Sequence, residues 1–222
     1  MKTNVYIDAG NLYYGLLRDD QSAKWLDPLA LARTLIRKDH VLGSVKFYTA
    51  RVRTYPYDAK AIERQRIYLR ALSEISGLEI VEGYYNRNKV WMPAVSSTCR
   101  NCNEATDGRV RIVKLEEKRT DVNITTDMLY DVFTDDIDAV ALISGDSDFI
   151  APLDLIRHKF GKQVLVFDPH ERFSDICYHA SYYAHIPRDL PAKCQLPDII
   201  PIGTHGRTIH RPAAWAAPAS AQ

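Results

Sequence analysis

The sequence predicts an α/β fold in which a central, mostly parallel sheet carries helices on both faces. Short apolar runs alternate along the chain with segments whose apolar residues recur at helical spacing, as in strand–helix–strand units. The run at residues 139–143 is almost purely apolar, as expected for a central strand covered on both sides. With 222 residues, 46% of them hydrophobic, the chain can bury a sizeable core without disulfides or a structural metal.

The expected elements follow one another from the N-terminus. The first strand ends at Asp8, and the residues after it turn into a helix. Asp27 and Pro28 form a typical helix start, a capping side chain followed by proline at the first helical position. Gly161 is expected to end a later helix. The other expected elements are strands at residues 45–52, 78–85, 139–143 and 163–167, and helices at 59–75 and 121–133, the last with Val122, Thr126, Leu129 and Phe133 aligned at the helical period.

Two stretches depart from this alternation of strands and helices. Residues 87–119 contain a Cys-x-x-Cys pair and many Lys and Arg, and we expect them to form an excursion from the core. Beyond Arg188 the chain is rich in proline and alanine and has no periodic pattern, which predicts an extended or disordered tail. The predicted organisation is therefore one domain over residues 1–187 and a tail over 188–222.

Composition excludes several classes of protein. The formal net charge is +1, so a nucleic-acid-binding surface would have to be local. Four cysteines are too few for a secreted disulfide framework in a chain of this length. The N-terminal segment lacks the apolar run of a signal peptide, and no stretch approaches the ~20 apolar residues of a membrane span. We expect a cytoplasmic protein with no membrane partner.

Aspartates gather where the apolar strands end. Asp8 closes the first strand, and Asp146 and Asp148 follow the strand at 139–143. Because ligands of open parallel sheets bind outside the carboxyl ends of the strands, these three carboxylates can meet there, with Asp121 as a fourth. Clustered carboxylates repel unless a cation neutralises them, and Mg²⁺ or Mn²⁺ prefers oxygen ligands. Such an ion can activate water and stabilise charge on phosphate.

The alternative interpretation is purely structural. An aspartate at a strand end is often a helix cap or a turn former, which would account for Asp8 and Asp148 as caps and for Asp146 as turn chemistry. Other phosphate and nucleophile signatures do not compete, since the chain contains no Gly-x-Gly-x-x-Gly loop, no Walker sequence and no Gly-x-Ser-x-Gly elbow.

The same residues carry a family resemblance. Three blocks, VYIDAGNL at 5–12, KRTDVNITTDML at 118–129 and LISGDSDF at 142–149, resemble in order the motifs of NYN domains, particularly the LabA-like group. The resemblance covers about residues 4–187. It implies a PIN-like fold, which is a Rossmann-like α/β sandwich with an acidic pocket for Mg²⁺ or Mn²⁺, and a ribonuclease or a protein descended from one.

Carried over by position, the resemblance assigns the acidic site. Asp8, Asp121, Asp146 and Asp148 would bind the metal and carry catalysis, and Asn11 would orient a water or a phosphate oxygen. Ser144 and Asp127 would support them, Asp127 from a second layer because it is rotated by about 120° from Asp121 around the helix. PIN nucleases in the wider sense usually add another acid, for which Glu63 is the nearest candidate.

The excursion holds further candidates. Cys99 and Cys102 have the spacing of half a zinc site, with a degenerate zinc ribbon or plain thiols as the alternative. Lys118 and Arg119 adjoin Asp121 and are expected to bind substrate phosphates. The other cations there, with Tyr84, Tyr85 and Trp91, fit RNA contacts and a solvated loop about equally.

The leading hypothesis is therefore a metal-dependent endoribonuclease acting on RNA, with transfer RNA or another structured RNA as a candidate substrate. The alternatives are an RNA-binding regulator without turnover and a structure-specific DNA nuclease. A phosphatase of the haloacid dehalogenase type requires Asp-x-Asp on the first strand, and Gly10 stands at its second acid. Tyr178, Tyr182 and Tyr183 fit a homodimer interface as well as a core.

Overall fold

A computed structural model describes residues 1–52, 58–94, 108–134, 136–203 and 206–216 of the chain. Its strands are β1 (Lys2–Asp8), β2 (Val41–Arg51), β3 (Leu78–Pro93), β4 (Arg109–Lys118), β5 (Ala139–Ile143), β6 (Gln163–Asp168), β7 (Tyr182–His185), β8 (Ile199–Ile202) and β9 (Arg207–His210). Its α-helices are α1 (Ala9–Leu12), α2 (Pro28–Leu35), α3 (Ala59–Leu72), α4 (Thr120–Thr134), α5 (Ile150–His158) and α6 (Leu190–Lys193).

The predicted α/β sandwich is confirmed. Within the described ranges, seven strands form one sheet in the order β4-β3-β2-β1-β5-β6-β7. Neighbouring strands run parallel except β3 and β4, which are antiparallel. The order reverses at β1, since the chain next adds β2 on one side of it and later adds β5 on the other. A pair of strands at such a reversal leaves a crevice at its carboxyl ends.

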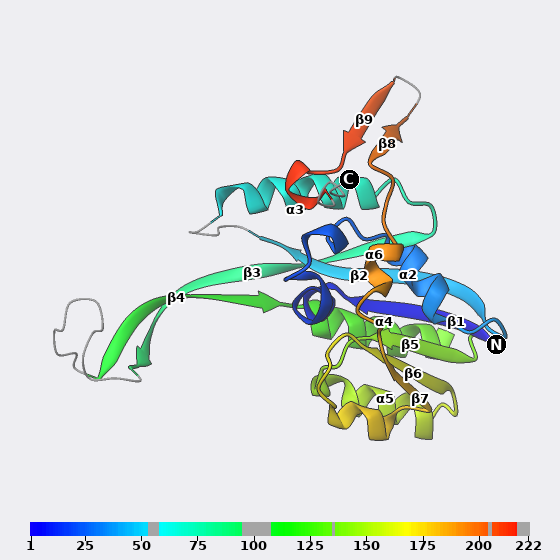
Figure 1. The fold of residues 1–222 in the computed structure, drawn as a ribbon. Helices are drawn as coiled ribbons and strands as arrows, with labels where there is room; N and C mark the ends of the chain where they lie inside the picture. The colour runs from blue at the N-terminus through cyan, green and yellow to red at the C-terminus, as the bar shows by residue number, and fades with distance from the viewer. Residues whose placement is uncertain (53–57, 95–107, 135, 204–205, 217–222) are drawn as a thin grey trace.

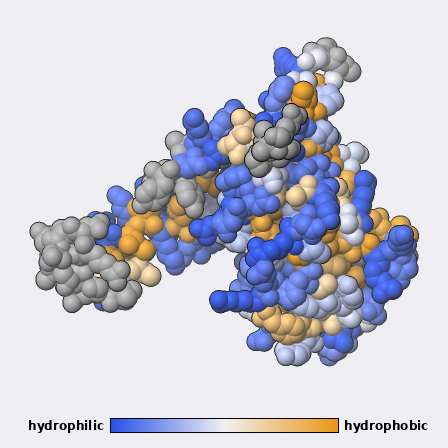
Figure 2. All heavy atoms as spheres, in the orientation of Figure 1, coloured by the Kyte–Doolittle hydropathy of each residue, from blue (hydrophilic) through white to orange (hydrophobic). Residues whose placement is uncertain are grey.

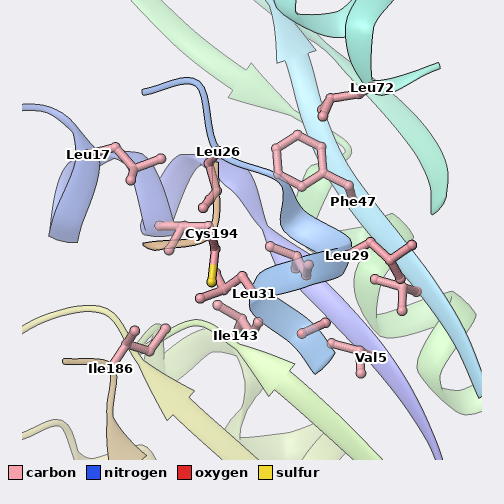
Figure 3. Packing of buried hydrophobic residues seen from close by; sticks show 14 of the residues in the cluster. Val5, Leu17, Leu26, Leu29, Leu31, Phe47, Leu72, Ile143, Ile186 and Cys194 are labelled. Atoms are coloured by element: carbon pink, nitrogen blue, oxygen red, sulfur yellow. The ribbon is translucent and has the colours of Figure 1, made fainter. Parts of the chain in front are cut away.

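Helices cover both faces of the sheet (Figure 1), and an apolar layer packs against each face. On one face, α2 and α3 and the turns after β1 pack with Val5, Ile7 and Ile143. Figure 3 shows this layer, in which Leu29 and Leu31 of α2 lie beside Phe47 of β2 and Cys194 of the C-terminal segment. On the other face, α4 and α5 pack against alternate residues of the same strands. Burial of both faces explains why β5 is apolar throughout.

Two of the expected helix boundaries are confirmed, whereas the helix expected at 59–75 ends at Leu72. The side chain of Asp27 accepts hydrogen bonds from the backbone N–H groups of Leu29 and Ala30 at 2.9 and 3.0 Å, and Pro28 opens α2. Gly161 adopts a φ of 66° after α5, the left-handed conformation that glycine tolerates best.

The predicted face of the 121–133 helix is wrong. Val122 and Phe133 are 66% and 78% exposed, so the stripe that contains them faces outward at both ends. The buried stripe of α4 consists of Thr120, Ile124, Met128, Asp131 and Val132. Asp131 lies in this apolar layer because the Lys46 ammonium, at 2.8 Å, and the Tyr6 hydroxyl, at 2.7 Å, satisfy its carboxylate.

The third strand is longer than predicted. It continues past Tyr85 to Pro93 and pairs with β4 from Tyr84↔Lys118 to Pro93↔Arg109. This hairpin, which we call the arm, extends away from the body of the molecule (Figure 1). It accounts for the described part of the stretch that the sequence places outside the core.

The expectation of an extended or disordered tail is wrong for the described part of residues 188–216. These residues form α6, a β8–β9 hairpin and a final 3-10 turn at Ala213–Trp215. Leu196, Ile200 and Ile209 are buried in the α2–α3 layer, and the Trp215 ring lies 6.3 Å from that of Trp25. The sequence pattern did not predict this packing, because the apolar residues that make contact here are scattered among prolines and alanines and are not regularly spaced.

Candidate active site

The carboxyl ends of three neighbouring strands place polar side chains in one row. Ile7 pairs with Ile143, and Ile143 pairs with Phe167, so the next residues, Asp8, Ser144 and Asp168, align across β1, β5 and β6. Strand alternation turns these side chains toward the α4–α5 face. All three are buried. This row marks the floor of the crevice at the reversal of strand order.

Asp8 is held by two hydrogen bonds. Its Oδ1 accepts from the backbone N–H of Asn11 at 2.9 Å, and its Oδ2 accepts from the Ser144 hydroxyl at 3.1 Å. Asp8 therefore does cap α1, as the structural interpretation holds, yet it is also only 6% exposed. Burial raises its pKa to about 6, and the charges of Asp121 and Glu117 add to the rise.

The loop after β5 presents the next two carboxylates. Asp146 caps the 3-10 turn Ser147–Phe149, since its Oδ1 accepts from the backbone N–H of Asp148 at 3.0 Å. Asn11 fixes this loop, because its Oδ1 accepts from the N–H of Gly145 at 2.9 Å. This hydrogen bond directly joins the first and third of the sequence blocks that resemble NYN motifs. The Asp148 side chain is exposed beside the turn.

Asp121 reaches the same crevice from the first turn of α4. Partial burial and the charges of Asp146, Glu117 and Asp148, in that order, raise its pKa. Asp121 therefore lies within electrostatic reach of Asp8, Asp146 and Asp148.

Glu117 is a fifth carboxylate, which sequence reasoning missed. Its Oε2 accepts from the Tyr85 hydroxyl at 3.0 Å, and its Oε1 accepts from the Thr120 hydroxyl. A Cβ added to Gly10 would lie 3.4 Å from Asp8 Oδ1 and 3.5 Å from Glu117 Oε2, so the two carboxylates flank Gly10. Its place beside Asp8 depends on the pairing of β4 with β3, which local sequence features do not reveal.

The acid proposed from sequence for this role lies elsewhere. Glu63 is exposed on α3 and pairs with Arg66 at 2.7 Å. Among the described residues Glu63 therefore belongs to a surface ion pair, and Glu117 is the additional acid beside Asp8.

The donor chemistry of the five acids fits a hard divalent cation. All are oxygen ligands, and in the described ranges none of them forms an ion pair with Lys or Arg. Burial is the main cause of the raised pKa values of Asp8 and Asp121, and the charges of neighbouring carboxylates add to both rises, which a cation would relieve. Within the described residues, however, no three such groups stand close enough to enclose one ion. The acids would have to move together to share it.

The other predicted residues lie around this centre. Asp127 accepts a hydrogen bond from the Tyr48 hydroxyl at 2.8 Å beneath α4. The Lys118 ammonium pairs with Glu116 at 3.1 Å. The Arg119 guanidinium lies 4.9 Å from the centre of the Tyr84 ring. Cys99 and Cys102 fall outside the described residues.

Asp168 is a second buried acid that the sequence did not single out. Its Oδ1 accepts from the N–H of His170 and its Oδ2 from the Tyr183 hydroxyl, both at 2.8 Å. A side chain on Gly145 would overlap this carboxylate, so Asp168 and Gly145 pack without space between them. An open pocket of about 570 Å³ continues from here, lined by Ser147, Phe173 and others.

The comparison with protein families agrees with this geometry. The model of the NYN domain matches residues 2–187. This chain belongs to the NYN domain family. The family supports a nuclease-type fold of the PIN-like superfamily for this chain, in accordance with the acids at the strand ends. No helix within the described residues is both long enough and apolar enough to cross a membrane.

Two individual proteins resemble this NYN domain. The 6-hydroxy-3-succinoylpyridine 3-monooxygenase HspA of Pseudomonas putida (strain DSM 28022 / S16) is 28% identical over 230 aligned residues, which cover 90% of this chain and 72% of that protein. A crystal structure of a protein of unknown function from Vibrio parahaemolyticus RIMD 2210633 aligns with a TM-score of 0.48 and 22% identity. The alignment covers 85% of this chain and 94% of that one.

Proposed function

We propose that this NYN domain is a metal-dependent ribonuclease of the LabA-like group that hydrolyses phosphodiester bonds of RNA in the cytoplasm. The observation that carries the proposal is the convergence of five carboxylates, without a cationic partner among the described residues, at the strand-order reversal. A metal held by these oxygen ligands can offset the charge that develops when a nucleic-acid phosphodiester is hydrolysed.

The site residues are proposed to have different roles, according to their surroundings. Asp8, Asp121, Asp146 and Asp148 would hold Mg²⁺ or Mn²⁺, which when bound activates water and stabilises charge on the phosphate. Asn11 and Ser144 keep Asp8 and the Asp146 loop in register through the hydrogen bonds described above.

Glu117 lies beside Asp8, where it can orient a water molecule. The hydroxyls of Tyr85 and Thr120 hold its carboxylate in place. A positioned carboxylate of this kind can accept a proton from the attacking water.

A cleavage assay tests the proposal. Purified protein would be incubated with structured RNAs, including transfer RNA, and with matched DNA, in Mn²⁺, Mg²⁺ or EDTA. We expect metal-dependent RNA cleavage that Asp146→Asn reduces by at least ~100-fold, as loss of a charge-stabilising group does. The matched control is Asp136→Asn, which removes an exposed carboxylate next to α4 and should leave cleavage unchanged.

The other outcomes each contradict the proposal in a distinct way. Cleavage that persists in EDTA would rule out metal dependence. RNA binding without turnover in either metal would support the regulator hypothesis. Preferential cutting of DNA flaps or single strands would support a structure-specific DNA nuclease.

One comparison favours a second candidate function. The relative named as a 3-monooxygenase aligns with 90% of this chain, and the 570 Å³ pocket beside Asp168 has a volume typical of small-molecule sites. The second candidate is therefore hydroxylation of a small aromatic ring. Consumption of 6-hydroxy-3-succinoylpyridine, in the presence of dioxygen and a two-electron donor, would support it, and its absence would exclude that substrate.

A further inference from the structure

The two faces of the arm differ in charge. In an antiparallel pair, directly opposed residues project to the same side, and alternate pairs project to opposite sides. One face carries Tyr85, Arg87, Lys89 and Trp91 of β3 with Glu117, Leu115, Val113 and Arg111 of β4 opposite them. We call this the cationic face. The opposite face carries Tyr84, Asn86, Asn88, Val90 and Met92 with Lys118, Glu116, Lys114, Ile112 and Val110.

Three cations of the cationic face differ from those of the opposite face in their partners. Arg87, Lys89 and Arg111 form no ion pair among the described residues. On the opposite face, by contrast, Glu116 pairs with both Lys114 and Lys118. Within these pairs the cationic face therefore carries three cations and one acid, Glu117, whereas the opposite face carries two cations that share one acid, Glu116, so the positive charge is larger and less compensated on the cationic face.

An exposed aromatic ring lies among these cations. Trp91 is 59% exposed and stands directly opposite Arg111. An indole held at the surface of a rigid strand, with arginine and lysine beside it, can stack on an unpaired base while the cations contact phosphates. In Figure 2 the arm shows hydrophilic surface along its length and a hydrophobic patch near its far end.

The cationic face begins in the acidic site. Glu117, which with Asp8 flanks Gly10, and Tyr85 are the first opposed pair of this face, and Arg87, Lys89 and Trp91 follow outward. The base of the arm also touches α4, because a Cβ on Gly83 would meet the Thr120 hydroxyl at 2.7 Å. From Glu117 to Arg111 the strand spans about 20 Å at ~3.4 Å per residue, enough for several nucleotides.

We propose that the cationic face of the arm binds single-stranded RNA and leads it into the acidic site, with Trp91 stacking on a base and Arg87, Lys89 and Arg111 contacting phosphates. This inference rests on the proposed function for the identity of the substrate. It goes beyond that function in two respects. It names the surface on which the substrate lies outside the site, and it states that this flanking segment of the RNA is unpaired. A polyanion is the partner that matches an excess of cations on one face of a two-stranded ribbon.

The test measures binding separately from cleavage. Fluorescein-labelled single-stranded RNA would be titrated in EDTA at several salt concentrations, with the wild type, with Arg87→Gln/Lys89→Gln, and with Lys114→Gln/Lys159→Gln as the charge-matched control. Each released phosphate contact changes the slope of log K against log salt by ~0.7 for single strands, so the first variant should lower the slope by about 1.4. The control should keep the wild-type slope.

Trp91 provides an independent readout. Trp91→Ala should weaken binding roughly 5- to 150-fold, the range for loss of one base–aromatic stack. It should also abolish any quenching of tryptophan fluorescence by RNA, since Trp25 is fully buried and Trp215 packs against it. Circular dichroism would show that the variants remain folded.

The outcomes separate this inference from the proposed function. If the wild type cleaves RNA but the Arg87/Lys89 and Trp91 variants bind and cut as it does, the arm assignment is wrong and the nuclease stands. If the variants lose binding of RNA that the wild type never cleaves, the arm assignment stands and the nuclease is wrong. Equally tight binding of a duplex through the same residues would overturn the assignment to single strands.

Discussion

The burial of Asp8 predicts that metal-free protein is destabilised by its own active site. The pKa of Asp8 rises from its ordinary 3.8 to about 6, mainly through burial. The folded protein therefore prefers the protonated carboxyl, and this preference stabilises the fold at pH below about 4 and is lost as the pH rises through 6. At about 1.4 kcal/mol for each pKa unit, the stability lost is ~3 kcal/mol.

Asp8→Asn should remove this pH-dependent penalty. The amide can still accept the hydrogen bond from the N–H of Asn11 and can donate to the Ser144 hydroxyl. In EDTA, we expect the variant to be ~1–3 kcal/mol more stable than the wild type at pH 8, and this difference to fall to about a third at pH 4.5. Part of the effect should decline with salt, because Asp121 and Glu117 contribute to the pKa shift.

Urea denaturation across about pH 4.5–8 measures the difference, with Asp136→Asn as the matched control. In a domain of this size each kcal/mol also moves the melting temperature by about 2–4 °C. Adding Mn²⁺ should stabilise the wild type more than the Asp8→Asn variant, because the ion binds the folded state. A variant less stable than the wild type at pH 8, or a difference that does not change with pH, would refute the reasoning.

Two further substitutions test the packing around the site. Gly145→Ala would force a Cβ into the buried Asp168 carboxylate and should cost ~1–3 kcal/mol and displace the Asp146 loop, measurable as lost stability and lost cleavage. Asp131→Asn would leave the Lys46 ammonium without its charged partner under α4 and should cost ~3–5 kcal/mol in urea denaturation. A cost below about 1 kcal/mol would mean that Lys46 reaches solvent.

Strands and helix ends were predictable from local chemistry, whereas the inward face of α4 was not. Both stripes of that helix contain apolar residues at the helical period, so periodicity alone fits Val122 and Phe133 as well as Ile124 and Met128. The buried stripe even includes a charged residue, Asp131. Its partners on β1 and β2 become visible only once the sheet is assembled.

The site residues likewise divide into those that local sequence features predict and those that they do not. The four aspartates could be found because each follows a strand or opens a helix, which is a local feature. Glu117 could not, because its place beside Asp8 depends on β4 pairing with β3 and returning the chain to the crevice. Asp168 needed the register of β1, β5 and β6, a relation among residues far apart in the sequence.

In the C-terminal segment, the end of the family match and the end of the packed core do not coincide. The family match ends at residue 187, yet Leu196, Ile200 and Ile209 fill the layer under α2 and α3. The stretch that the family model matches is thus shorter than the part of the chain that packs together. A fragment cut at the family boundary would leave apolar surface of α2 and α3 open to water, and it would be prone to aggregate before its chemistry could be assayed.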